Sequence, residues 1–213
     1  MDSLTDMEVV PVVTLLSVII LLYLFIVLTK MVMKGRCGGI DSGFSRALTA
    51  RRRGGAIYTL FSTITHLGSL KILLPAIVAI SLVAIRKGES IEALYADIFF
   101  LTSVLCVYAV KYAIDRKRPR YGSCIVMPSD PSYPSAHTLQ IFSFTLMVVP
   151  LCIDIFSLDP FWVMALFISL SVTVALSRIY LGVHFASDVA GGVILASLWS
   201  AVEYLFGSFG GNI

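Results

Sequence analysis

The segment from 177 to 188, Ser-Arg-Ile-Tyr-Leu-Gly-Val-His-Phe-Ala-Ser-Asp, contains side chains capable of catalysis and lies between two long apolar runs. Ionisable residues beside membrane-embedded helices are functional candidates. His184 and Asp188 are four residues apart and would share a helix face, so the carboxylate could hold one imidazole nitrogen and leave the other free to react. Arg178 could bind a phosphate through its planar guanidinium group. The alternative is an interfacial turn whose polar side chains reach toward water.

A second group of such residues, Pro134-Ser135-Ala136-His137, directly precedes another apolar run. Proline is favourable in the first turn of a helix, so this group is expected to begin one. The amides of Ser135, Ala136 and His137 would have no partner inside the helix and would form an anion-binding site. Ser135 adds a hydroxyl group, and His137 could transfer a proton near neutral pH. An ordinary capped helix with an interfacial histidine is the alternative.

A third group consists of two basic residues at the end of a preceding run. Lys111 and Arg118 are seven residues apart, so they would share a face if the helix continues that far. Pro119 predicts that this helix ends at Arg118. Basic residues at a span end also serve as membrane anchors, which is the alternative role. Three flanking basic residues are interpreted as part of a solvated loop, with attraction of anionic headgroups as the alternative: Arg116, Lys117 and Arg120.

These groups must be positioned by helices that cross a membrane, because 58% of the residues are hydrophobic and the mean hydropathy is +0.92. A spanning helix needs about 20 apolar residues. We predict a single all-α domain, residues 1–213, built as an integral membrane bundle of six transmembrane helices with a short interfacial helix between the first two. The predicted spans are residues 9–29, 65–85 with a helical lead-in from 57, 91–112, 134–155, 161–181 and 183–205.

Charge and cysteine patterns restrict the class of protein. The net charge is +3, and the basic residues flank apolar spans, which argues against a nucleic-acid partner. The acidic N-terminus is unlike a secretory signal, so the first span is expected to be retained. The four cysteines lack metal-ligand spacing. Cys37 and Cys124 fall in loops predicted on one side of the membrane, where they could form a disulfide in an oxidising compartment.

Six spans would bring the loop after the third span and the turn after the fifth to the same membrane face. Two guanidinium groups, an ammonium group, a helix N-terminus and two histidines would then converge. Such a site suits a phosphoryl group, which needs donors for its oxygens, a nucleophile and an acid for the leaving oxygen. No carboxylate cluster is available for Mg²⁺, so we expect metal-independent chemistry, with no cofactor and no metal site.

The three groups together resemble the signature of the type-2 phosphatidic acid phosphatase superfamily in order, spacing and position at span ends. Ala136 is the one departure, because the family usually has glycine there. A helix N-terminus does not require positive φ, so we expect alanine to be compatible with activity. The matching segments are Lys-x6-Arg-Pro at 111–119, Pro-Ser-Ala-His at 134–137 and Ser-Arg-x5-His-x3-Asp at 177–188.

The resemblance implies that His184 is a nucleophile that forms a phosphohistidine and that Asp188 orients it. His137 would protonate the leaving group and then activate water. The remaining histidine, His66, is expected to be an interfacial residue without a catalytic role. The resemblance further implies a set of groups that hold the phosphate: Lys111, Arg118, Ser135, Arg178 and the backbone amide of Ala136.

The resulting hypothesis is an integral membrane lipid phosphatase whose partners are the bilayer and a lipid phosphate or pyrophosphate. Polyprenyl pyrophosphate, phosphatidate, phosphatidylglycerophosphate and phosphorylated glycolipids are all candidate substrates, because the motifs recognise only phosphate. A lipid phosphotransferase that uses the same site is one alternative, and a non-enzymatic membrane scaffold or transporter is another. Haloperoxidases share the signature but are soluble proteins.

The side of the membrane on which the site lies is left open by two conflicting indications. The resemblance implies a multi-pass protein of the plasma or inner membrane with an extracytoplasmic site. Most lysines and arginines, including those of the basic segment from 30 to 55, fall on the same face as the site. The positive-inside rule would place that face in the cytoplasm.

Overall fold

The computed structural model describes residues 2–49, 55–119 and 128–210, and every regular element within these ranges is helical. This confirms the predicted all-α class. A 3₁₀ turn, Thr65–Gly68, follows α3, and a π-helical turn, Phe144–Val148, joins α6 to α7. The α-helices are α1 (Asp2–Met33), α2 (Gly38–Thr49), α3 (Ala56–Ile64), α4 (Leu70–Lys87), α5 (Ser90–Ile114), α6 (Ala136–Ser143), α7 (Val149–Phe156), α8 (Pro160–Tyr180) and α9 (Ala186–Gly210).

The apolar helices form a multi-pass membrane protein, as predicted. Within the described ranges, two helical pieces, Ala56–Gly68 and Leu70–Lys87, meet at an angle of 48° and together form a candidate sixth span. The first piece corresponds to the predicted helical lead-in. Five other spans within the described residues are each long and apolar enough to cross a membrane: Pro11–Met33, Ser90–Ile114, Ala136–Phe156, Pro160–Tyr180 and Ala186–Gly207.

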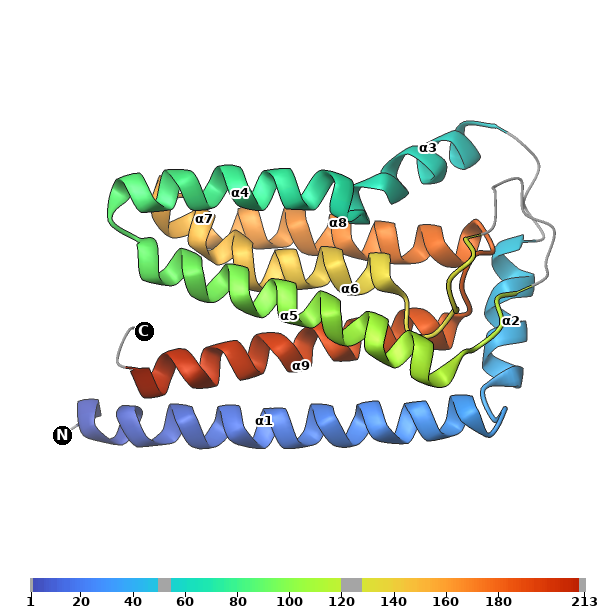
Figure 1. The fold of residues 1–213 in the computed structure, drawn as a ribbon, viewed down its shortest axis with the longest axis horizontal. Coiled ribbons are helices and arrows are strands. Elements are labelled where there is room, and N and C mark those ends of the chain that lie inside the picture. The colour runs from blue at the N-terminus through green and yellow to red at the C-terminus, as the bar shows by residue number, and fades with distance from the viewer. Residues whose placement is uncertain (1, 50–54, 120–127, 211–213) are drawn as a thin grey trace.

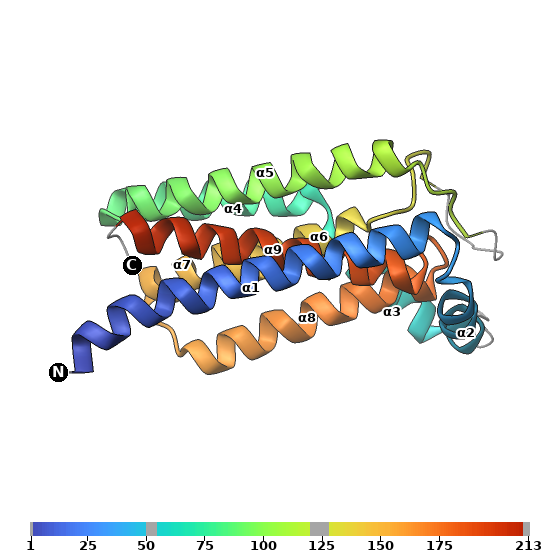
Figure 2. The ribbon, with the colours of Figure 1, turned by 90° about the horizontal axis from the view of Figure 1, so that it is seen from below.

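The helices lie side by side in a bundle, with α6 and α7 surrounded by the others (Figures 1 and 2). Ala136–Phe156 is 67% buried inside the protein, whereas Pro11–Met33 is only 11% buried. The fourth span therefore forms the core, and α1, which packs along α9, presents most of its apolar side chains to lipid. The start of α1 and the end of α9 lie at the same end of the bundle, as expected for six spans (Figure 1).

The predicted interfacial helix is present as α2, which lies across the other end of the bundle (Figure 1). It covers the end where α8 finishes and α9 begins, and it contacts both of those helices. The parts of the basic segment at 50–54, as well as Arg120 and Cys124, lie outside the described residues. The proposed pairing of Cys124 with Cys37 is therefore not assessed, although Cys37 itself is buried.

Two helix ends differ from the prediction. Helix α5 ends at Ile114 because Asp115 adopts a left-handed conformation with φ of 47°, so the helix stops before Arg118. The restriction that Pro119 places on the backbone of Arg118 therefore acts outside the helix, in a segment without regular structure. Helix α9 begins at Ala186 and not at 183, because a turn with Gly182 at φ of 70° precedes it.

Close packing of α9 against the start of α6 depends on two adjacent glycines. A Cβ atom added to Gly192 would lie 2.7 Å from the Ser135 carbonyl oxygen, and one added to Gly191 would lie 2.6 Å from the Tyr133 ring. These contacts are shorter than van der Waals separations. The two glycines therefore allow the helix that carries Asp188 to approach the N-terminus of α6.

Candidate active site

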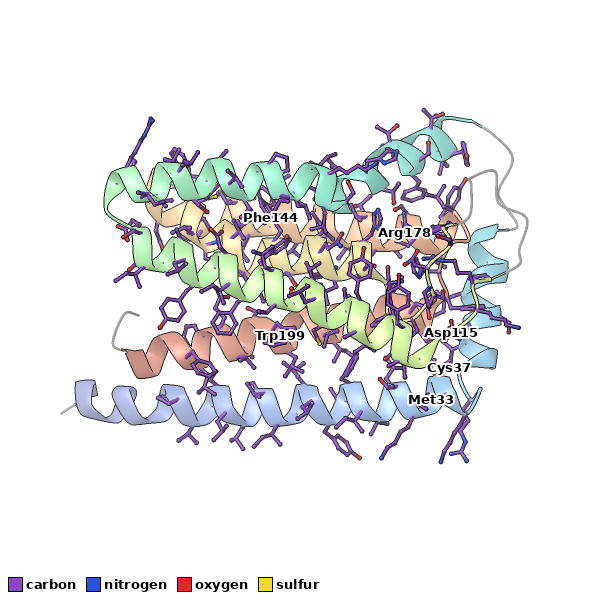
Figure 3. All side chains as sticks on the ribbon, in the orientation of Figure 1. Met33, Cys37, Asp115, Phe144, Arg178 and Trp199 are labelled. Atoms are coloured by element: carbon purple, nitrogen blue, oxygen red, sulfur yellow. The ribbon has the colours of Figure 1, made fainter. Side chains whose placement is uncertain are left out.

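The candidate site lies at the end of the bundle that α2 covers. Figure 3 shows Arg178, Asp115 and Cys37 toward this end of the bundle. Three segments meet there: the irregular segment 115–119 after α5, the segment 128–135 before α6 and the turn 181–185 before α9. Segments that are far apart in the sequence thereby supply neighbouring polar side chains.

His184 and Asp188 contact each other, although they do not share a helix face as expected. His184 lies in the turn before α9, and Asp188 lies in the first turn of that helix. The His184 Nδ1 atom is 3.4 Å from Asp188 Oδ2. The same carboxylate oxygen accepts a 2.9 Å hydrogen bond from the Phe185 backbone N–H. Asp188 therefore fixes the turn that presents His184 as well as the histidine ring.

The hydrogen-bond partners of His184 define its tautomer. Arg118 Nη1 lies 3.1 Å from His184 Nε2, and a guanidinium group can only donate. Nε2 therefore carries the lone pair, and Nδ1 carries the hydrogen that faces Asp188. Burial, opposed by the hydrogen bond to Asp188 and reinforced by the charge of Arg178, lowers the pKa of His184 to about 3. The ring is therefore neutral, with Nε2 able to attack, at any ordinary pH.

The Asp188 carboxylate is surrounded by donors that the sequence did not reveal. Ser132 donates to Oδ2 at 2.5 Å, and Arg116 Nη1 donates to Oδ1 at 2.5 Å. Asp188 itself is fully buried. The prediction that Arg116 belongs to a solvated loop is wrong, since it pairs with the carboxylate that holds His184. Its guanidinium group also packs over the Phe185 ring, 4.3 Å from the centroid.

Helix α2 contributes a second carboxylate to this network. Arg116 Nη2 lies 2.7 Å from Asp41 Oδ2, and Asp41 also accepts hydrogen bonds from the backbone N–H and hydroxyl group of Ser187. Asp41 is only 2% exposed. The sequence predicted only a short interfacial helix here, and Asp41 makes that helix part of the support for Asp188. No local sequence pattern distinguishes this aspartate from a surface residue.

We expect Arg116→Ala to lower kcat about 10- to 100-fold while changing KM much less, because it leaves two buried carboxylates without their shared cation. The matched control is Lys117→Ala, which removes a charge from the exposed neighbouring position. Steady-state rates on a lipid phosphate, with the melting temperature of each variant, measure the effect. Equal rates for the two variants would show that the contacts of Arg116 with Asp188 and Asp41 have no catalytic consequence.

Lys111 and Arg118 converge through a carboxylate and not through a common helix face. Lys111 is fully buried, and its Nζ lies 2.8 Å from Asp130 Oδ2. Arg118 Nη2 lies 2.8 Å from Asp130 Oδ1. Burial raises the pKa of Asp130, but the hydrogen bond and charge of Lys111, with those of Arg118, outweigh it and hold the pKa below its ordinary value. Asp130 is therefore ionised and bridges both cations.

Arg178 is buried near the end of α8, and its backbone carbonyl accepts the His184 N–H at 3.3 Å. Its Nη1 donates to Thr65 Oγ1 at 2.7 Å, a partner supplied by the 3₁₀ turn in the bent second span. Its Nε finds no hydrogen-bond partner among the described residues. A buried cation with an unused donor is suited to bind an anionic ligand.

The predicted helix N-terminus is present, with Ser135 as the N-cap and Ala136 as the first residue of α6. The Ser135 N–H donates to the Asp188 carbonyl oxygen at 2.9 Å, which connects this terminus to the turn of His184. The Ser135 hydroxyl accepts a 2.9 Å hydrogen bond from Thr138. Ala136 has a right-handed helical backbone, so its methyl group introduces no backbone strain.

His137 lies in the first turn of α6 and is half-buried. The charges of Arg178, Lys111 and Asp130 act on its ring, as does His184, so His137 lies near the same cluster. No hydrogen bond holds its ring among the residues that the structure describes. His66, by contrast, is exposed on the 3₁₀ turn.

A cavity of about 430 Å³ opens beside Arg116 and Arg118. It is lined by residues 115–118 after α5 and by residues 128–131, including Arg116, Arg118 and Asp130. A phosphate group in this cavity would contact the Arg118 guanidinium group, which pairs with Asp130. Arg118 connects this cavity to the neutral imidazole of His184, because its Nη1 atom lies 3.1 Å from His184 Nε2.

The family model described as the PAP2 superfamily matches residues 93–209. Phosphatidylglycerophosphatase B of Bacillus subtilis (strain 168) is 28% identical over 177 residues, which cover 82% of this chain and 86% of that protein.

Two solved structures are also similar. The crystal structure of a transmembrane PAP2-type phosphatidylglycerolphosphate phosphatase from Bacillus subtilis has a TM-score of 0.78 and 27% sequence identity, covering 89% of this chain and 95% of that one. The structure of LpxE from Aquifex aeolicus has a TM-score of 0.61 and 18% identity, covering 78% and 94% of the two chains. The second likeness concerns the fold alone.

Proposed function

The chain belongs to the PAP2 superfamily of membrane lipid phosphatases, and from this premise we propose that it hydrolyses a lipid phosphomonoester or pyrophosphate through a phosphohistidine on His184. The observation that carries the proposal is the orientation of His184. Its Nδ1–H faces Asp188, and its Nε2 lone pair faces the cation of Arg118, which lines the cavity.

In the first step, His184 Nε2 forms a bond to phosphorus and the bond from phosphorus to the lipid oxygen breaks. His137 donates a proton to that oxygen, so the lipid leaves as a neutral alcohol. Asp188 stabilises the positive charge that develops on the His184 ring. The negative charge of the transferring group is stabilised by the proposed phosphate ligands: Lys111, Arg118, Ser135, Arg178 and the Ala136 amide.

In the second step, water attacks the phosphorus of the phosphohistidine while His137, now neutral, accepts a proton from that water. The bond between Nε2 and phosphorus breaks, and inorganic phosphate leaves. The two steps return His137 and His184 to their starting protonation states. Three cationic side chains supply the charge needed at the phosphoryl group, which supports a metal-independent reaction.

The substrate is proposed to be a membrane lipid whose headgroup enters while its tail stays in the bilayer. The names of the Bacillus subtilis relatives favour phosphatidylglycerophosphate as the first lipid to test. Phosphatidate, polyprenyl pyrophosphate and phosphorylated glycolipids offer the same terminal phosphate. We place the site on the extracytoplasmic side of the membrane, following the family resemblance.

Purified protein in detergent with excess EDTA is expected to release phosphate from one of these lipids far faster than from the others. Orthovanadate should inhibit the reaction, because it mimics the pentacoordinate phosphorus of the transition state. Phosphate release is measured across the four lipid classes, with the His184→Gln variant as the blank. Absence of release by folded protein, or release that needs added metal, would overturn the proposal.

A further inference from the structure

Asp130 forms ion pairs with two of the cations assigned to the substrate phosphate, although none of the sequence motifs includes this aspartate. One carboxylate oxygen lies 2.8 Å from Lys111 Nζ, and the other lies 2.8 Å from Arg118 Nη2. The Asp130 backbone carbonyl accepts a further hydrogen bond from Arg118 Nε at 2.9 Å. A carboxylate that bridges two cations makes the same contacts as two oxygens of a phosphate group.

The pairing also directs Arg118 toward the nucleophile. With Nε and Nη2 bound to Asp130, Arg118 Nη1 donates to the Val183 carbonyl at 2.8 Å and to His184 Nε2 at 3.1 Å. The guanidinium group thus covers the lone pair that attacks phosphorus in the proposed reaction. A phosphate group that reaches His184 must therefore take Arg118 away from these partners.

Asp130 lies on the path by which a headgroup would arrive. Its side chain is 25% exposed and lines the cavity of about 430 Å³. Lys111, by contrast, has 0% exposure and does not line the cavity. Arg118 also lines this cavity. A phosphate entering from the cavity would meet the Asp130–Arg118 pair before it reaches Lys111.

We infer that Asp130 is a specificity-determining residue, an internal anion that competes with the substrate phosphate for Lys111 and Arg118. The inference rests on the proposed function, because it takes these two cations as phosphate ligands. Only a group that binds the cations better than a carboxylate displaces Asp130, and the carboxylate takes the cations back when phosphate leaves. A residue that merely orients the two cations would have the opposite effect on binding, since its loss would weaken the affinity for phosphate.

The test is direct binding of two phosphate-like probes, inorganic phosphate and tungstate, to detergent-purified protein by calorimetry. Asp130→Asn removes the charge while keeping the shape, and we expect it to lower the dissociation constant of both probes about tenfold or more. Asp115→Asn is the matched control, because Asp115 lines the same cavity and asparagine tolerates its left-handed backbone. The control should change each constant less than threefold.

A dissociation constant that is unchanged or higher in Asp130→Asn would overturn the inference. Asp130→Ser provides a second variant, and both must fold, as judged by gel filtration and melting temperature. The binding measurement does not depend on turnover, so absence of lipid hydrolysis by the wild-type protein would count against the proposed function alone. If the wild type hydrolyses lipid, the KM of Asp130→Asn should fall together with the dissociation constants.

Discussion

His184→Ala is expected to lower kcat by about 10⁴-fold or more on every lipid substrate, because it removes the atom that bonds to phosphorus. Water could attack phosphorus directly in the variant. Nothing would orient that water as Asp188 orients the imidazole of the wild type. Initial rates of phosphate release measure the loss. The matched control is His66→Ala, which removes an exposed histidine from the 3₁₀ turn and should retain wild-type activity.

The covalent intermediate gives this prediction a second readout. Substrate labelled in its phosphate should transfer the label to wild-type protein during a rapid quench at alkaline pH, where phosphohistidine survives. Peptide mapping should place the label on His184. Normal turnover with no labelled protein, or labelling that persists in His184→Ala, would contradict the assignment of the nucleophile.

Much of the fold was predictable because membrane insertion imposes a strong local signal. Each span must form its own backbone hydrogen bonds and contain about 20 apolar residues, so hydropathy alone locates it. Even the bent second span was partly visible, as a helical lead-in from 57. Helix ends were less predictable. The end of α5 depends on the left-handed backbone of Asp115, which the downstream Pro119 does not reveal.

The sequence predicts contact between His184 and Asp188 from helical periodicity. The contact exists, but the two residues do not lie on one helix. Helix α9 begins only at Ala186, so the histidine approaches the aspartate from a turn. The two residues lie close together because only four positions separate them in the sequence. The hydrogen bond from the Phe185 N–H to Asp188 stabilises that turn. The spacing was thus informative even though the expected conformation was wrong.

The supporting residues of the site could not be predicted, because they come from segments that meet only in the folded protein. Asp41 lies 75 residues before Arg116, and Thr65 lies 113 residues before Arg178. Each looks like an ordinary polar residue of a loop or helix in the sequence. Asp130 and Ser132 lie closer to a motif, but nothing in a single sequence distinguishes them from the rest of a proline-rich loop.

His137→Gln should slow the hydrolysis of a lipid phosphate by about 10²- to 10⁴-fold, the range typical of a lost general acid–base. The residue lies in the first turn of α6, beside the charges of Arg178 and Lys111, where a leaving oxygen can receive its proton. The size of the effect should depend on the leaving group. An alkoxide needs the proton, whereas nitrophenolate leaves readily without it.

With nitrophenyl phosphate, the first step of His137→Gln should therefore remain fast, and loss of the base should slow only the attack of water on the phosphohistidine. Stopped-flow absorbance should show a burst of nitrophenolate close to the enzyme concentration, followed by a slow steady state. The wild type should show a smaller burst, because both steps retain their acid–base group. Equal slowing on both substrates without a burst would mean that His137 supports the structure of the site and transfers no proton.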